Sequence, residues 1–199
     1  EVTEEIVLKM AKHVKSITDQ KYLCLAGGVA LNCVANGKLL RSGIFDDIFI
    51  QPAAGDAGGA LGCAYIAWYQ HLGNTRKADG KTDFMNGAYL GPEFSNDEIK
   101  NYLDRKGYYY KKLTDEELPG KIADLINEQN VIGWFQGRME FGPRALGGRT
   151  IIGDSRSSDT QRTINLKIKY RESFRPFAPS IREENISEYF DIDRPSPYM

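Results

Sequence analysis

A repeated pattern of strand, glycine-rich turn and helix over residues 23–62 constrains this chain more than any other feature. Short apolar runs at residues 22–25 and 48–50 have the length and composition of β-strands, and each leads into a glycine-rich turn that opens a helical pattern. Glycine lets backbone N–H groups approach a bound group closely, and the start of a helix adds partial positive charge. Two such turns predict an α/β fold with one anion-binding crevice at the carboxyl ends of the strands.

Length and composition set broad limits on the fold and its partners. The chain has 199 residues, 41% of them hydrophobic, which is enough for one large domain or two small ones. The net charge of −1 provides no global basic field that would draw the chain to nucleic acid or to a membrane surface. An anion site must therefore be built locally.

The cysteines and the apolar runs indicate a compartment. Cys24, Cys33 and Cys63 are odd in number, lack a CxxC spacing and have apolar neighbours, which predicts reduced core cysteines in a cytoplasmic protein. No long apolar run and no signal-like N-terminus is present, so we expect neither a membrane span nor export.

The first glycine turn supplies candidate ligand-binding residues. Gly27 and Gly28 follow the first strand, and a helix is predicted over residues 30–40. A GG pair alone is a plain tight turn, and its pairing with a second glycine-rich turn favours ligand binding. Asn32 and Asn36 lie four residues apart on the predicted helix, where a hydrogen bond to a sugar or base and a packing role are equally good interpretations.

Asp56 lies in the second glycine-rich turn, directly after Gly55, at the entrance to an apolar helix predicted over residues 61–69. An N-cap whose carboxylate accepts the first free N–H groups of the helix is the simpler interpretation. The alternative is a metal ligand at the mouth of the crevice, which needs partners such as two histidines or phosphate oxygens. His71 is too far along the helix to be that partner.

A polar segment rich in turn formers over residues 72–86 predicts a domain boundary. We assign residues 1–75 to a first domain, residues 76–85 to a linker and residues 86–199 to a second domain. The second domain is expected to contain elements whose patterns are clear: helices over 95–106, 115–129 and 158–170, and strands over 108–110 and 131–135.

Basic residues concentrate between positions 138 and 175, where nine of them stand against four acidic residues. Arg144 lies among Gly142, Pro143 and a glycine pair, and Arg175 lies between Phe174 and Pro176, so restrained neighbours favour ligand binding by these arginines and by Lys169. A solvated charged face is the better interpretation for the less restrained members, Arg138, Arg156, Arg162 and Lys167. The interspersed acidic residues argue against a nucleic-acid surface.

Four stretches together resemble the O-carbamoyltransferase family, which includes the nodulation and tobramycin-type carbamoyltransferases. They are AGGVALN at 26–32, QPAAGDAGGALGCA at 51–64, GRMEFGPRALGGRTIIGDSR at 137–156 and INLKIKYRESFRPFAPSI at 164–181. They occur in the family's order, and EFGPRALG and FRPFAP are specific to it. The resemblance implies the C-terminal part of an actin-like (ASKHA), Kae1-like domain followed by the first part of a YrdC-like domain.

The resemblance also implies an activity. Carbamoyl phosphate and ATP form carbamoyladenylate in the YrdC-like domain, and the carbamoyl group then passes to an acceptor hydroxyl in the Kae1-like domain. Because the family's histidine metal pair and the rest of both domains lie outside this sequence, the fragment alone is expected to be inactive. The implied site residues are catalytic Arg144, Lys169 and Arg175, nucleotide-binding Gly27, Gly28, Asn32 and Gly55, and Asp56 as a ligand of an iron-type divalent metal, with Mg²⁺ accompanying ATP.

Two alternatives remain open at this point. The first is a tRNA threonylcarbamoyl-type enzyme, because the Kae1-like and YrdC-like parts both have relatives in that pathway. The GPRALG and FRPFAP stretches favour the O-carbamoyltransferase. A non-catalytic nucleotide-binding or RNA-binding module is the alternative from a different class. The expected partners are carbamoyl phosphate, ATP and a hydroxylated small-molecule acceptor whose identity the sequence does not specify, with no membrane partner and nucleic acid disfavoured.

Overall fold

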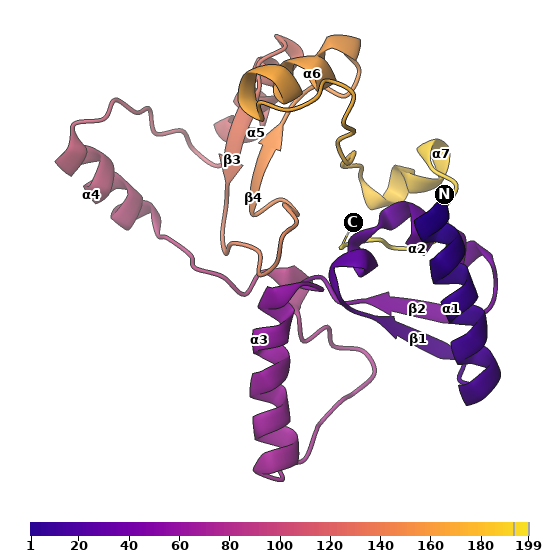
Figure 1. Ribbon diagram of the computed structural model, residues 1–199. Helices are drawn as coiled ribbons and strands as arrows, with labels where there is room; N and C mark the ends of the chain where they lie inside the picture. Colours follow the sequence, from indigo (N-terminus) through magenta and orange to yellow (C-terminus); the bar gives the residue numbers. More distant parts are fainter. Residues whose placement is uncertain (193, 199) are drawn as a thin grey trace. The chain divides into compact units, whose positions relative to one another are not determined.

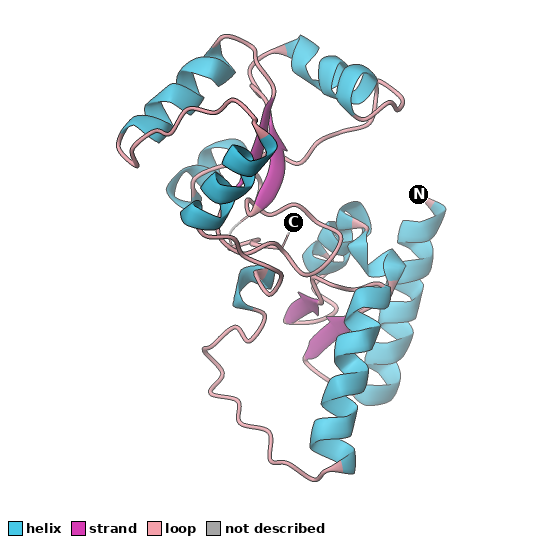
Figure 2. Ribbon diagram, turned by 90° about the vertical axis from the view of Figure 1, so that its left-hand side faces the viewer, coloured by secondary structure: helices cyan, strands magenta, loops and turns pink. Residues whose placement is uncertain are grey.

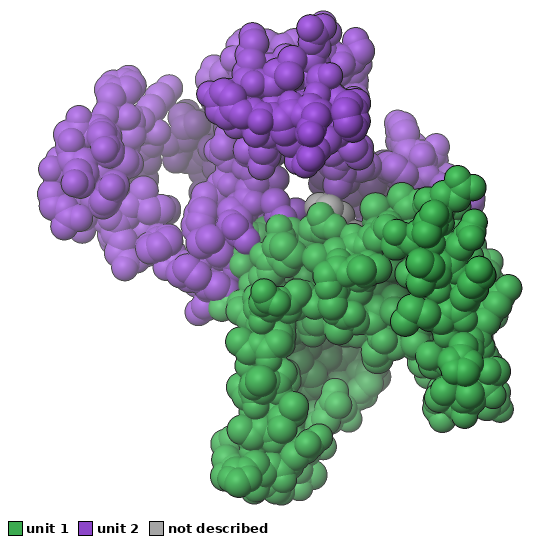
Figure 3. Space-filling view, viewed as in Figure 1, with its two compact units in different colours: residues 1–90, 140–144, 198–199 green, residues 91–139, 145–197 purple. Residues whose placement is uncertain are grey.

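A computed structural model describes residues 1–192 and 194–198 and divides the chain into two compact units. The first unit comprises Glu1–Leu90 and Glu140–Arg144 together with the end of the chain, and the second comprises Gly91–Met139 and Ala145–Pro197 (Figure 3). Both units mix helices with a small sheet, as the α/β class predicts (Figure 2). Within the described residues, no helix combines the length and apolarity needed to cross a membrane.

The first unit is built on a parallel pair of strands, as the strand pattern predicts. β1 (Tyr22–Leu25) and β2 (Asp47–Ile50) pair in parallel, with Leu23 opposite Ile48. The helices α1 (Val2–Thr18) and α2 (Cys33–Arg41) contact each other beside the sheet (Figure 1). Burial of Ala11, Leu39 and Phe45 between these elements forms the core of the unit.

The cysteine prediction is only partly correct, since Cys24, Cys33 and Cys63 are free thiols but all three are exposed. Strand residues alternate between the two faces of a sheet. Leu23 and Leu25 point to the face that α1 and α2 cover, and Cys24 points to the opposite face with Tyr22, which is 70% exposed. No element of the described residues buries that second face, so Cys24 is not a core residue.

The helix predicted over residues 30–40 is interrupted at Asn32. A 3₁₀ turn, η1 (Gly28–Leu31), comes first, and Asn32 then caps α2 by accepting the Ala35 N–H with its side-chain oxygen at 3.1 Å. Asn36 donates its side-chain amide to the carbonyl of Ala30 at 2.7 Å. Both asparagines therefore bond to local backbone, because their short amides compete with the helical hydrogen-bond ladder.

The helix that follows the second glycine turn begins earlier in the chain than the predicted range of residues 61–69. α3 (Asp56–Tyr65) starts within the turn and continues as a π-helical turn, η2 (Ile66–His71). Ala53, just before it, is fully buried. A Cβ at Gly58 would overlap the carbonyl oxygen of Ala53, so glycine is required there for the close approach of helix and turn.

The second unit contains an antiparallel pair of strands. β3 (Ile132–Phe135) confirms the strand predicted over residues 131–135. It pairs with β4 (Arg149–Ile152), a strand that the sequence analysis does not predict.

The predicted helices of the second unit are present. Those over 95–106 and 115–129 are α4 (Asn96–Lys106), which begins with a capping box of Ser95 and Glu98, and α5 (Glu117–Asn127). The helix predicted over 158–170 is α6 (Ser158–Thr163) followed by a π-helical turn, η4 (Ile164–Ile168). The remaining short helices are η3 (Asn86–Ala88) in the first unit and η5 (Glu183–Asn185) and α7 (Ile186–Tyr189) in the second.

The strand predicted at residues 108–110 is wrong. This segment has no regular structure, and Tyr109 is 97% exposed. Tyr110 instead donates its hydroxyl to the Asp104 carboxylate of α4 at 3.0 Å. Aromatic β-propensity depends on a neighbouring strand and a covered face, and this segment pairs with neither β3 nor β4.

Gly58→Ala and Gly59→Ala form a matched pair that tests the packing of the second glycine turn. The Gly58→Ala variant is expected to lose about 1–3 kcal/mol of unfolding free energy, because its methyl group overlaps the Ala53 carbonyl. A Cβ at Gly59 meets nothing within 4 Å, so Gly59→Ala is expected to gain up to about 1 kcal/mol from helix propensity. Urea denaturation measures both changes, and equal stabilities of the two variants would contradict the packing described.

Candidate functional site

The two glycine-rich turns are hydrogen-bonded to each other. The Gly27 N–H donates to the carbonyl of Ala54 at 2.7 Å, with Gly27 in a positive-φ conformation of 93°. The Gln51 N–H donates to the Leu25 carbonyl at 3.1 Å, where the two parallel strands end. Four of the predicted site residues therefore lie in joined turns at one edge of the sheet: Gly27, Gly28, Gly55 and Asp56.

The segment Glu140–Arg144 packs on these turns, and its contacts group it with the first unit. The Phe141 N–H donates to the Ala88 carbonyl at 2.6 Å, and the side chain of Glu140 is buried. Gly142 has φ 130°, and a Cβ there would lie 3.0 Å from the carbonyl oxygen of Pro52. A glycine is thus needed for the close fit of this segment against the second turn. The sequence assigns residues 140–144 to the second domain, and that boundary stays a prediction.

Arg144 is fixed beside the first glycine turn. Its half-buried guanidinium donates from Nη2 to the carbonyl of Leu31, the last residue of η1, at 2.7 Å. No other hydrogen bond or ion pair engages this side chain within the described residues. Its Nε and Nη1 donors are therefore available to an anion, while one bond to backbone restrains the group.

Asp56 is the first residue of α3, and Gly55 occupies the N-cap position without a side-chain cap. The N-cap interpretation of Asp56 is therefore wrong by one residue. The exposed carboxylate lies in the first helical turn, where negative charge is favourable. Among the described residues no group of three or more His, Cys, Asp or Glu side chains could hold a metal ion, so Asp56 is not part of a complete metal site here.

Lys169 and Arg175 belong to the second unit. Lys169 is exposed and directly follows the π-helical turn η4. Arg175 pairs through Nε with Glu172 at 2.7 Å, and both side chains remain about half exposed. The pKa of Glu172 is lowered, first by its hydrogen bond to backbone and then by the positive charge of Arg175. Because Arg144 belongs to the other unit, the three predicted catalytic cations are divided between the two units.

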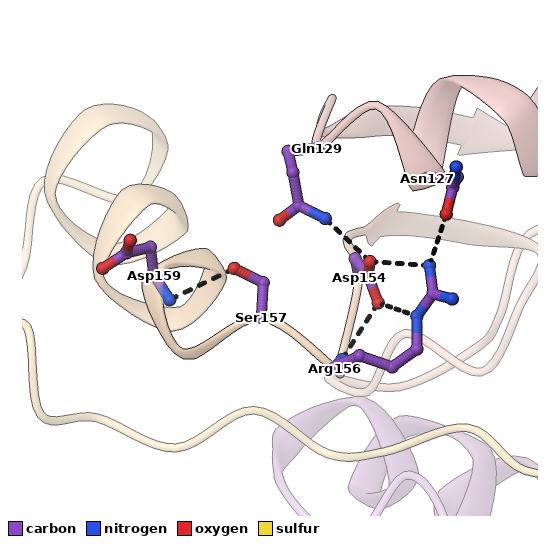
Figure 4. A network of polar contacts seen from close by, with 6 residues as sticks. All are labelled: Asn127, Gln129, Asp154, Arg156, Ser157 and Asp159. Atoms are coloured by element: carbon purple, nitrogen blue, oxygen red, sulfur yellow. Dashed lines mark hydrogen bonds and ion pairs between the residues drawn. The ribbon is translucent and has the colours of Figure 1, made fainter.

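A buried carboxylate pairs with Arg156, which the sequence analysis assigns to a solvated charged face and whose side chain is indeed 70% exposed. Asp154, only 5% exposed, accepts from Nε and Nη2 of Arg156, each at 2.9 Å, and from the Arg156 backbone N–H (Figure 4). Gln129 donates to the same carboxylate at 2.8 Å, and Arg156 also donates to Asn127. Arg156 is therefore oriented by bidentate pairing with Asp154. The sequence feature that could have predicted this pair is an Asp two residues before an Arg, just after a strand.

Comparison with known proteins places this geometry in a family. A family model described as carbamoyltransferase N-terminus matches residues 1–65, and one described as carbamoyltransferase C-terminus matches residues 123–199. The joined glycine turns lie in the first match, and the Arg144, Lys169 and Arg175 segments lie in the second. The chain belongs to the carbamoyltransferase family.

Curated relatives match most or all of the chain. An uncharacterised protein of Synechocystis is 58% identical over 200 residues, covering 100% of this chain and 32% of its own length. The nodulation protein NolO of Bradyrhizobium diazoefficiens is 43% identical, covering 100% of this chain and 36% of its own length. The 3′-hydroxymethylcephem-O-carbamoyltransferase of Amycolatopsis lactamdurans is 34% identical, covering 89% of this chain and 31% of its own length. The chain spans about a third of the length of these relatives.

The Asp154 network is expected to make stability depend on acid pH. Hydrogen bonds from the Arg156 side chain, and then from its backbone, hold the pKa of Asp154 well below its ordinary value of 3.8. A lowered folded-state pKa gives stability that is present above the unfolded pKa of about 3.9 and is lost as pH falls toward the folded pKa. Asp154→Asn should therefore be destabilised at neutral pH, with a difference from the parent protein that shrinks below about pH 4.

Urea denaturation across pH 3–7 measures this difference, with Asp159→Asn as the control. Asp159 is an exposed carboxylate nearby that makes no side-chain ion pair with a described residue (Figure 4). A gap between Asp154→Asn and the parent that stays constant from neutral to acid pH would contradict the network's electrostatic role.

Proposed function

We propose that this chain is part of an ATP-dependent O-carbamoyltransferase that forms carbamoyladenylate and transfers the carbamoyl group to an acceptor hydroxyl. The observation that carries the proposal is the joining of the two glycine turns by the Gly27–Ala54 hydrogen bond, with Arg144 fixed beside them at Leu31. The cephem O-carbamoyltransferase among the relatives supports a hydroxyl acceptor. The nodulation relatives support the same family chemistry.

The finer fold assignment is part of the proposal. Residues 1–75 are the C-terminal part of a Kae1-like, actin-like domain, residues 76–85 a linker and residues 86–199 the first part of a YrdC-like domain. The parallel β1–β2 pair with glycine turns at its carboxyl edge supports the first of these, since α/β sheets bind nucleotides at that edge.

Open space in front of the backbone supports nucleotide binding at the first unit. A Cβ added to Gly27, Gly28 or Gly55 would meet no atom within 4 Å, so a phosphate has room to approach the backbone at these glycines. The Gly27 N–H itself is used by the bond to Ala54, so Gly27 contributes close approach and not a donor. Asn32 at the start of α2 and Arg144 beside η1 add polar groups at the same turn. These residues are proposed to hold the nucleotide.

Asp56 is proposed as one ligand of an iron-type divalent metal, which would polarise the carbamoyl carbonyl when bound. One carboxylate oxygen suits a hard cation, and the other ligands of the proposed centre belong to residues outside this chain. Mg²⁺ is proposed to accompany the ATP phosphates.

The cationic segment of the second unit suits the donor substrates. Carbamoyl phosphate, ATP and one water together give carbamoyladenylate, phosphate and pyrophosphate, and both phosphorylated reactants are multiply anionic. Such reactions depend on charge neutralisation and alignment more than on covalent help from the protein. Lys169 and Arg175 are proposed to bind the phosphate oxygens. Glu172 partly balances Arg175 until an anion competes for the guanidinium.

Arg144→Ala in the full-length protein is expected to abolish pyrophosphate release that depends on carbamoyl phosphate. The substitution removes a restrained cation beside the first glycine turn. Arg162→Ala is the control, because Arg162 is exposed and its side chain makes no hydrogen bond or ion pair with the described residues. Normal release by Arg144→Ala, with a melting temperature equal to that of the control, would count against the proposal.

The activity itself is tested by incubating the full-length protein with ATP, carbamoyl phosphate and a panel of hydroxylated small molecules. A carbamate ester on one acceptor, seen by mass spectrometry, is the expected product. RNA binding that weakens steeply with salt, combined with a melting temperature that carbamoyl phosphate does not raise, would favour a nucleic-acid-binding module instead.

A further inference from the structure

Two side-chain amides on one helical face hold the backbone of residues 173–175. Asn165 donates from Nδ2 to the carbonyls of Ser173 and Arg175, at 3.1 and 2.8 Å. Gln161 donates from Nε2 to the carbonyls of Phe174 and Arg175, at 3.1 and 2.9 Å. The two amides lie four residues apart, so they share a face. Together they form a clamp on three consecutive carbonyls.

Asn165 is fully buried, with an exposed fraction of 0%, and full burial is uncommon for an asparagine. A buried amide must have its donors and acceptor satisfied, and every side-chain partner of Asn165 comes from residues 171–175. The residue lies in the π-helical turn η4, closed by the Lys169 N–H donating to the Ile164 carbonyl at 2.9 Å. Single π-helical turns occur frequently at functional sites.

The acceptor side of Asn165 fixes an arginine rather than backbone. Arg171 donates from Nε to Asn165 Oδ1 at 2.6 Å and from its backbone N–H to the Asn165 carbonyl at 3.0 Å. Its guanidinium carbon lies 4.9 Å from the ring centroid of Phe177, a cation–π distance. Tyr170, with φ 50°, turns the chain back so that Arg171 can reach Asn165.

Arg171 is therefore restrained at one edge and on one face, while its two terminal nitrogens make no hydrogen bond within the described residues. Nη1 and Nη2 of Arg171 therefore remain available, and such a pair of guanidinium nitrogens can bind an oxyanion bidentately. Loop stabilisation alone would need the two carbonyl bonds of Asn165, but it would not need the bond to Nε. The half-exposed Arg175 depends on the same clamp through its own carbonyl.

We propose that Asn165 is a positioning residue, which holds Arg171 and Arg175 in the arrangement that binds the phosphate oxygens of the acyl phosphate donor. The inference rests on the proposed function for the identity of that donor. Asn165 does not touch the donor, and its effect passes through the arginine side chain at Oδ1 and the loop backbone at Nδ2. Gln161 supports the backbone half of the clamp alone.

The test uses Asn165→Leu and Gln161→Leu in the full-length protein, with hydrogen exchange of the amides of residues 171–175 as the first readout. Both variants are expected to exchange these amides about tenfold faster or more. Asn165→Leu is also expected to raise the KM for carbamoyl phosphate about tenfold with a smaller change in kcat, because a ground-state contact is lost. Because Gln161 is exposed, Gln161→Leu carries the exchange test if Asn165→Leu does not fold.

Asn130→Leu is the matched control, since Asn130 also donates its amide to a backbone carbonyl of the second unit, that of Leu125 at 3.0 Å. It should change neither readout. Unchanged exchange in both clamp variants, or faster exchange with an unchanged KM for carbamoyl phosphate, would overturn the positioning role.

Binding of inorganic phosphate, measured by calorimetry, separates this inference from the proposed function. Absence of pyrophosphate release by the parent protein would contradict the proposed function alone. Phosphate affinity that falls about tenfold in Asn165→Leu still supports positioning in that case, and an unchanged affinity overturns it.

Discussion

The hydrogen bond from the Gly27 N–H to the Ala54 carbonyl is the constraint on which the first unit's site depends. Parallel neighbouring strands end at the same edge of a sheet, so the turns after β1 and β2 emerge side by side. The bond then fixes the separation of the two turns. Gly142 fits against Pro52 at that separation only because it has no Cβ, and Arg144 then reaches the Leu31 carbonyl.

The two units hold their arginine side chains in place in different ways. In the first, backbone groups hold backbone groups, and cationic character is supplied by one arginine bonded to a carbonyl. In the second, buried polar side chains hold the cationic loops: Asp154 orients Arg156, and Asn165 orients Arg171. Buried polar groups of this kind favour one arrangement when fully satisfied and are costly when a partner is lost. Both solutions restrain arginines without neutralising every donor.

Sequence patterns could predict the elements whose signals are local. Strands β1 and β2 and helices α4 and α5 follow from periodicity. The break at Asn32 could have been predicted from the preference of asparagine for caps, but the apolar neighbours favoured a continuous helix. The strand predicted for the tyrosine run was wrong because strand propensity counts only where a partner strand exists.

The candidate site was less accessible to sequence reasoning. The glycine turns and the restrained Arg144 were visible from their neighbours, whereas the contact of residues 140–144 with the first unit depends on residues far apart in the chain. Asn165 and Asp154 gave little signal because isolated polar residues in a charged stretch resemble solvated surface. Their burial arises only when α6, η4 and the following loop pack together.

Single-residue amide hydrogen exchange in the full-length protein tests the central claim most directly, because it reports the Gly27–Ala54 and Phe141–Ala88 bonds separately. If the Glu140–Arg144 segment is held by η3 and by the joined turns as described, both amides should exchange about 100-fold or more slowly than in an unstructured peptide, and Gly142→Ala should speed both together. A Phe141 amide that exchanges at the unprotected rate while Gly27 stays protected would contradict the account.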